Sequence, residues 1–119
     1  MSALKRGRKP LNRKRRRRGS RLEDIVARRY EKAGYKVEKH KVTSAGEIDV
    51  LATRRKSRIC SEVKSGRQII TSKEVLKLVN KASRTRSKPV LIIGPRVKLT
   101  DPAKRTASKH DVRIKKLKI

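Results

Sequence analysis

The stretch that most constrains the fold is a continuous apolar run, Val90–Ile93, preceded by Pro89 and followed by Gly94. An apolar run of this length without alternation is typical of a β-strand that is buried on both faces. Such a strand needs packed layers on both sides of its sheet. The run therefore predicts an α/β domain with this strand in the centre of the sheet.

The other elements follow from apolar periodicity and from capping and turn residues. Ser20 and Thr71 each begin a capping box, Gly34 ends the first helix, and Asp101 with Pro102 begins the third. We expect helices over residues 20–34, 71–84 and 103–109, and strands over residues 35–42, 46–52, 59–64, 89–94 and 112–117. The order αβββαβαβ is that of an α/β domain with a mixed sheet. We place this domain at residues 21–119, after a basic extension at residues 1–20.

Two finer expectations concern the direction of side chains. Helical spacing predicts the apolar face of the second helix, and alternation predicts which residues of the strand 46–52 share a face. The expected helix face is Val75, Leu76, Val79 and Ala82, and the expected strand pattern is Ile48, Val50 and Ala52 on one side with Glu47, Asp49 and Leu51 on the other.

Candidate chemistry lies in a hairpin formed by the second and third strands. Glu62 and Lys64 are two residues apart, so in a strand they project from the same face. The turn at residues 54–57 folds this strand back on the one before it, which brings Asp49 close to Glu62. Two carboxylates at one point form a site for a hard divalent cation such as Mg²⁺, and a neighbouring lysine can hold a water molecule or offset phosphate charge.

An Asp followed after a hairpin by Glu-x-Lys resembles the PD-(D/E)xK nuclease superfamily, above all archaeal Holliday-junction resolvases and Mrr-type restriction endonucleases. The resemblance covers residues 19–116 and implies the restriction-endonuclease-like fold. It implies a catalytic site of Glu23, Asp49, Glu62 and Lys64, with Asp49 and Glu62 as ligands of Mg²⁺. Asp49 follows Ile48, where the family's name has proline.

Simpler interpretations of these residues stay open. Glu62 and Lys64 can form an ordinary salt bridge on the sheet, and Asp49 can be a solvated strand residue. Glu23 can cap the first helix through the amide of Ser20, with or without a second role as a ligand. Glu47 can replace or crowd Asp49. Cys60 and the two histidines do not have the spacing of a zinc site, so we expect no structural metal.

Charge defines the partner class. The 119 residues carry 38 basic and 10 acidic side chains, a formal net charge of +28. A folded chain with this self-repulsion is expected to bind a polyanion, and nucleic acid is the default. Residues 1–21 hold eleven of the cations and no acid, which leaves +17 for the remainder. The expected contacts are Lys5, Arg6, Arg8, Lys9, Arg13, Lys14, Arg15, Arg16, Arg17, Arg18, Arg21, Arg84, Arg86 and Lys88.

Two functions fit this sequence, and they belong to different classes. The surplus of cations favours tight, sequence-independent binding, which is typical of a ribosomal protein bound to ribosomal RNA beside other ribosomal proteins. The alternative is a Mg²⁺-dependent endonuclease for branched or foreign DNA, expected to act as a homodimer. The charge balance favours the ribosomal interpretation. Neither function involves a membrane, and both predict a cytoplasmic protein.

The basic extension generates the first prediction. Deleting residues 1–21 removes eleven cations that release counter-ions from phosphates, so the affinity for RNA should fall and its dependence on salt should become less steep. A binding titration at several salt concentrations measures both quantities. A salt slope equal to that of the full chain would contradict the prediction.

Overall fold

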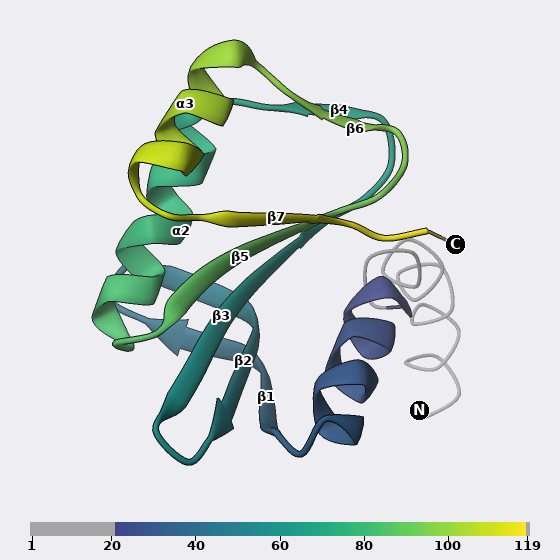
Figure 1. Ribbon diagram of the computed structural model, residues 1–119, viewed down its shortest axis with the longest axis vertical. Coiled ribbons are helices and arrows are strands. Elements are labelled where there is room, and N and C mark those ends of the chain that lie inside the picture. Colours follow the sequence, from purple (N-terminus) through teal and green to yellow (C-terminus); the bar gives the residue numbers. More distant parts are fainter. Residues whose placement is uncertain (1–20, 119) are drawn as a thin grey trace, which may run out of the picture.

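A computed structural model describes residues 21–118, which form one mixed β-sheet with helices on both faces (Figure 1). The first helix covers residues 21–32. The elements after it are β1 (Lys36–Thr43), β2 (Gly46–Arg54), β3 (Ser57–Lys64), β4 (Gln68–Ile70), α2 (Ser72–Arg84), β5 (Lys88–Ile93), β6 (Val97–Leu99), α3 (Asp101–Lys109) and β7 (Arg113–Lys116).

The main sheet has the strand order β1-β2-β3-β5-β7. The pairs β1–β2 and β2–β3 are antiparallel, whereas β3–β5 and β5–β7 are parallel, so the predicted mixed sheet is confirmed. β1 and β7 are the edge strands. β5 is an interior strand but is not the middle one, because β3 has two strands on each side. Helical layers on both faces of the sheet bury its apolar run. Such burial requires an interior strand, which need not be the middle one.

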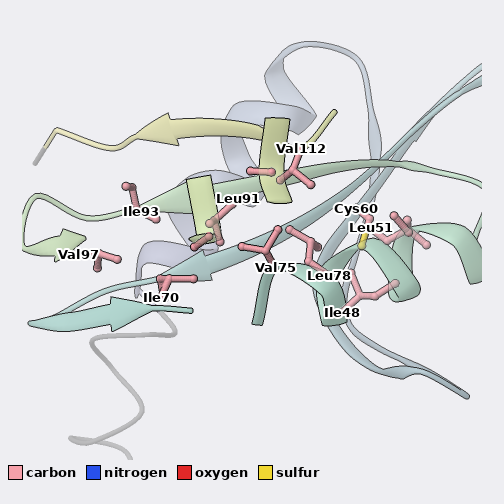
Figure 2. Close-up of a cluster of buried hydrophobic side chains, with 13 residues drawn as sticks. Ile48, Leu51, Cys60, Ile70, Val75, Leu78, Leu91, Ile93, Val97 and Val112 are labelled. Carbon is pink, nitrogen blue, oxygen red and sulfur yellow. The ribbon is translucent and has the colours of Figure 1, made fainter. Parts of the chain in front are cut away.

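Two hydrophobic clusters lie on opposite faces of the sheet. One packs α2 and α3 against the inner strands, and its members include Leu51, Cys60 and Leu91 (Figure 2). The other packs the first helix, through Leu22 and Val26, against the opposite face. The apolar run of β5 contributes alternately to both clusters, which explains why its sequence shows no polar positions.

The caps of the later helices follow their sequence signals. The Thr71 amide donates to Glu74 Oε1 at 3.2 Å, and the Thr100 hydroxyl accepts from the Ala103 amide at 3.1 Å. Ser20 lies outside the described residues, so the proposed cap of the first helix stays a prediction. The apolar face of α2 differs from the predicted one, because Leu78 is buried and Leu76 is 42% exposed. Positions 75, 78 and 82 follow the helical repeat more closely than the adjacent pair 75 and 76.

The structure adds two short strands to the predicted order. β4 and β6 pair in parallel as a separate two-stranded sheet. The segment 66–70 was expected to be a loop or short extension, and the segment 95–99 a connection. Three-residue strands lack the length for periodicity to reveal them. No helix in the described part of the chain is long and apolar enough to span a membrane.

The packing of β5 generates a stability prediction. Ile92 is 5% exposed, and an aspartate there would place an unpaired charge among apolar side chains at a cost of several kcal/mol. Domains of this size are stable by about 5–15 kcal/mol, so Ile92→Asp should unfold the protein or lower its melting temperature sharply. Ile69→Asp is the matched control, because Ile69 is 65% exposed and should tolerate the same change. Equal melting temperatures for the two variants would contradict this prediction.

Candidate active site

The β2–β3 hairpin opens where the candidate carboxylates lie. Its ladder extends to the pair Val50–Ser61 and does not continue to Asp49. Beyond that point, Asp49 Oδ2 accepts a hydrogen bond from the Val63 amide at 2.8 Å. A side chain thus takes the place of a backbone acceptor and satisfies an amide that the ladder leaves unpaired. This bond fixes Asp49 beside the strand that carries Glu62, as predicted from the hairpin.

The pairing of β2 with its other neighbour, β1, is also interrupted at Asp49. In the β1–β2 ladder, Lys39 pairs with Val50 and Lys41 with Ile48, while His40 and Asp49 form no pair. His40 has φ of 57°, in the left-handed region that few non-glycine residues occupy. Such backbone outliers cost about 1–3 kcal/mol and cluster at functional sites.

The irregularity corrects the predicted strand pattern. Ile48 packs in the cluster beneath α2, whereas Val50 packs in the cluster beneath the first helix. The predicted pattern placed both on one face, because it assumed a regular pleat through Asp49. The broken pairing at Asp49 changes the face on which the following residues lie.

His40 joins the first helix to this edge of the sheet. Its Nε2 lies 3.2 Å from Glu23 Oε1, and its Nδ1 lies 2.8 Å from Glu47 Oε2. Glu23, His40 and Asp49 each offer a ligand atom within 4.8 Å of the others. Glu23 therefore faces Asp49, as the family resemblance implies, and Glu47 is held away by the histidine without replacing Asp49.

Glu62 and Lys64 project toward α2, where they enter a row of alternating charges. Lys81 Nζ lies 3.2 Å from Glu62 Oε1, and Lys64 Nζ lies 3.9 Å from Glu62 Oε2. Lys64 is also 3.7 Å from Glu74 Oε2. The predicted salt bridge between Glu62 and Lys64 is thus present, and α2 adds a second lysine and a second carboxylate. These side chains line a cavity of about 210 Å³ between β3 and α2.

Gly46 permits the close approach of Lys81. Gly46 begins β2 with φ of 125°, and a Cβ atom built there would lie 3.0 Å from Lys81 Cε. Any larger residue would strain the backbone and displace the Lys81 side chain from Glu62. The glycine of the Gly46-Glu47-Ile48-Asp49 sequence therefore shapes the site without contributing a functional group.

Burial and like charges act together on the carboxylates. Burial, followed by the charge of Asp49, raises the pKa of Glu62 above its ordinary value, and Lys81 offsets part of this increase. The pKa of Glu23 is raised by the same two causes and is lowered in part by His40. Buried carboxylates that repel one another are the arrangement that a divalent cation relieves.

The donor set fits a hard divalent cation. Asp49 and Glu23 offer carboxylate oxygens within 4.8 Å of one another, which Mg²⁺ prefers, and Asp49 keeps Oδ1 free of the Val63 hydrogen bond. Glu62 lies outside this group. The nearby thiol is not a ligand of this kind. Burial raises the pKa of the Cys60 thiol to about 11, which is characteristic of an inert core cysteine.

The predicted nucleic-acid contacts fall in two places. Residues 5–18 lie outside the described residues, so those contacts stay predictions. Arg84, Arg86 and Lys88 are exposed at the beginning of β5. Lys88 pairs with Ile59 and Ile93 with Lys64, so this group lies at the opposite end of the central strands from Lys64.

The comparisons with known proteins agree with this fold. Residues 15–118 match the Mrr_cat family, described as restriction endonuclease. The match covers most of the chain, and the protein therefore belongs to this restriction endonuclease family, with the PD-(D/E)xK nuclease-like fold. No match was found among the curated proteins.

Solved structures share the fold at low sequence identity. A protein of unknown function is 20% identical with a TM-score of 0.65, over 80% of this chain and 56% of the other. SfsA from Pyrococcus furiosus in complex with Ca²⁺ is 19% identical with a TM-score of 0.58, over 83% and 57%. EndoMS bound to dsDNA is 22% identical with a TM-score of 0.57, over 71% and 36%. The chain thus spans between about a third and somewhat over half of the length of these structures.

Sequence reasoning missed three residues of the site. His40 was considered only as a zinc ligand, Lys81 is one of many lysines, and Glu74 was assigned only a capping role. A histidine seven positions before the strand's Glu-Ile-Asp is a weak signal by itself. Only the packing of α2 and β1 on the hairpin brings these side chains to Glu62 and Asp49.

The raised pKa values generate a prediction about metal binding. Protons compete with a cation for Glu62 and Glu23, and these carboxylates titrate above their ordinary values. In the folded protein they favour the protonated form, so their ionisation destabilises the metal-free fold as pH rises. The increase in melting temperature caused by Mg²⁺ should therefore be larger at about pH 7.5 than at about pH 5.

Thermal denaturation with and without Mg²⁺ measures this difference. Glu62→Gln should remove most of the increase at both pH values, whereas Glu31→Gln, at an exposed position of the first helix, should behave like the wild type. A Mg²⁺ effect that is equal at the two pH values would contradict the prediction.

Proposed function

We propose that this protein is a divalent-metal-dependent DNA endonuclease. The observation that carries the proposal is at the open end of the β2–β3 hairpin: Asp49 accepts a hydrogen bond from the Val63 amide, and Glu62 and Lys64, on either side of Val63, form an ion pair at 3.9 Å. The family assignment supports it, because the chain belongs to a restriction endonuclease family over residues 15–118. Metal dependence is proposed from the donor set, with Mg²⁺ as the expected ion.

Asp49 and Glu62 are the residues that would hold the cation. A bound Mg²⁺ would polarise the scissile phosphate and lower the pKa of a water molecule that attacks it. Asp49 is held for this role by the Val63 amide at 2.8 Å, so its carboxylate needs no rearrangement before binding. Glu62 lies in the cavity beneath α2, where burial excludes water and strengthens electrostatic interactions.

Lys64 would orient the attacking water and offset the charge of the phosphate. Its ammonium group lies between the Glu62 and Glu74 carboxylates, at 3.9 Å and 3.7 Å, so two acids restrict its position. Lys81 binds the other Glu62 oxygen at 3.2 Å and leaves Lys64 the weaker contact. The difference between these two contacts supports a catalytic role for Lys64, whereas Lys81 would keep Glu62 ionised.

Glu23 would support the site from the first helix. Its carboxylate faces Asp49 and is bonded to His40 at 3.2 Å. His40 is itself bonded to Glu47, so a chain of three side chains positions Glu23 at the metal-binding edge. We assign His40 a positioning role, because Mg²⁺ prefers oxygen to imidazole ligands.

DNA is proposed as the substrate in place of ribosomal RNA. The surplus of cations favours a polyanion without distinguishing the two, and nothing in the comparisons supports a ribosomal role. EndoMS, which has the same fold, is described in complex with dsDNA. The homodimer expected for a nuclease stays part of this proposal, since cleavage of both strands of a duplex requires two sites.

The decisive prediction concerns cleavage. Purified wild type should cleave duplex or junction DNA with Mg²⁺ or Mn²⁺. Asp49→Asn and Glu62→Gln should each reduce the rate by at least about a hundredfold, because each removes the charge of a metal ligand. DNA affinity in the absence of metal should remain within about threefold, because the basic surface is unchanged.

Glu31→Gln is the control for loss of one exposed carboxylate and should cleave like the wild type. Gel electrophoresis of the products and fluorescence anisotropy of labelled DNA measure the two effects. A wild type that cleaves neither substrate with either ion, while co-sedimenting with ribosomal subunits after a high-salt wash, would overturn the proposal and restore the ribosomal interpretation.

A further inference from the structure

The β4–β6 pair continues the β3–β5 pair past the candidate active site. Lys64 pairs with Ile93 at the end of one ladder, and Gln68 pairs with Val97 at the start of the other, four residues later on both strands. The register is therefore preserved across the connection. Figure 1 shows the two strands after a bend beyond the ends of β3 and β5, from which they lead back toward α2 and α3. We call residues 67–70 and 95–99 the ribbon.

The ribbon is attached firmly to the domain. Ile70 and Val97 are 1% and 2% exposed and belong to the main hydrophobic cluster, where Figure 2 shows them on the same side as Ile93. The Gly94 amide donates to the Lys64 carbonyl at 2.9 Å, and the Thr100 amide donates to the Ile70 carbonyl at 3.1 Å. The outer side chains of the ribbon are thus presented from a fixed backbone.

The outer face of the ribbon is basic with an apolar centre. Arg67, Arg96 and Lys98 are exposed, and Ile69, which pairs with Lys98, is 65% exposed. These residues line an open hollow of about 680 Å³ together with Gln68 and Pro95. None of the lining residues in the described part of the chain is acidic.

Charge decides between the possible occupants of this hollow. Three cations without a carboxylate match a polyanion, and two copies of the ribbon placed together would bring like charges into contact. A solvent-exposed isoleucine among these cations also fits a nucleic acid, since minor-groove binders combine basic side chains with apolar ones that contact base steps. The chemistry therefore favours nucleic acid over a second copy of the chain.

The ribbon begins close to the candidate catalytic residues. Arg67 is three residues after Lys64, so the two backbones are within about 11 Å of one another. Arg84, Arg86 and Lys88, the basic group expected from sequence, lie at the far end of the same strands. The ribbon is therefore the basic group that is placed to contact phosphates next to one held at the candidate site.

We propose that the ribbon is a DNA-backbone binding site in which Arg67, Arg96 and Lys98 contact phosphates next to the metal-binding edge. The identity of the ligand as DNA rests on the proposed endonuclease function. The proposal adds a site that neither the family motif nor the basic extension contains.

The test compares two triple variants with equal loss of charge in the Asp49→Asn background, which prevents cleavage. One carries R67Q, R96Q and K98Q, and the other carries R84Q, R86Q and K88Q. Fluorescence anisotropy with a labelled DNA duplex gives affinity at several salt concentrations, and thermal denaturation verifies folding. The ribbon variant should bind at least about tenfold more weakly, and its salt slope should decrease by about 2 to 3, while the control should change less in both quantities.

Equal or greater loss in the R84Q, R86Q and K88Q control would overturn the proposal. So would a self-association interface, seen as a dimer of the DNA-free wild type that Ile69→Ser converts to a monomer. Failure of the proposed endonuclease function is recognised separately, because cleavage is measured with the wild-type protein and not in the Asp49→Asn background. If the wild type does not cleave DNA but only the ribbon variant loses affinity, the proposed binding site is retained and the proposed endonuclease function is rejected.

Discussion

The hydrogen bond from the Val63 amide to Asp49 Oδ2 is the interaction on which the site depends. It terminates the β2–β3 ladder at Val50 and Ser61 and substitutes a carboxylate for a backbone carbonyl. Because the buried amide must find an acceptor, the carboxylate is fixed at the place where the strands separate. Burial raises the pKa of Glu62, the residue before Val63, and the negative charge of Asp49 adds to this increase.

Basic side chains of the site offset the electrostatic repulsion between its carboxylates. Lys81 from α2 and Lys64 from β3 both approach Glu62, and His40 from β1 approaches Glu23. Each of these contacts comes from a different layer or edge of the sheet. The site thus draws the first helix, the edge strand and α2 together at one end of β3. A left-handed residue, His40, and a glycine with positive φ, Gly46, mark the backbone adjustments that this convergence requires.

The positive charge of this protein and the geometry of its candidate site carry different information about function. The net charge of +28 concerns attraction to a polyanion at long range and does not specify a reaction. The basic composition alone therefore favoured a ribosomal protein, whereas the order of elements and the family match favour a nuclease. The exposed cations of the ribbon connect the two, since they place part of the positive charge beside the proposed metal site.

The sequence by itself determined the order of the main elements, the mixed sheet, the pairing of Glu62 with Lys64, and the position of Asp49 beside the strand that carries them. These depend on local periodicity, capping residues and one hairpin, which are short-range properties. Only the tertiary structure decided the roles of His40, Lys81 and the ribbon, the exposure of Leu76, and the opposite faces of Ile48 and Val50. Those features arise where segments distant in the sequence pack together, and a break in the pleat at Asp49 leaves no periodic signal. Packing across layers therefore supplied what local patterns could not: the partners that hold each carboxylate in place.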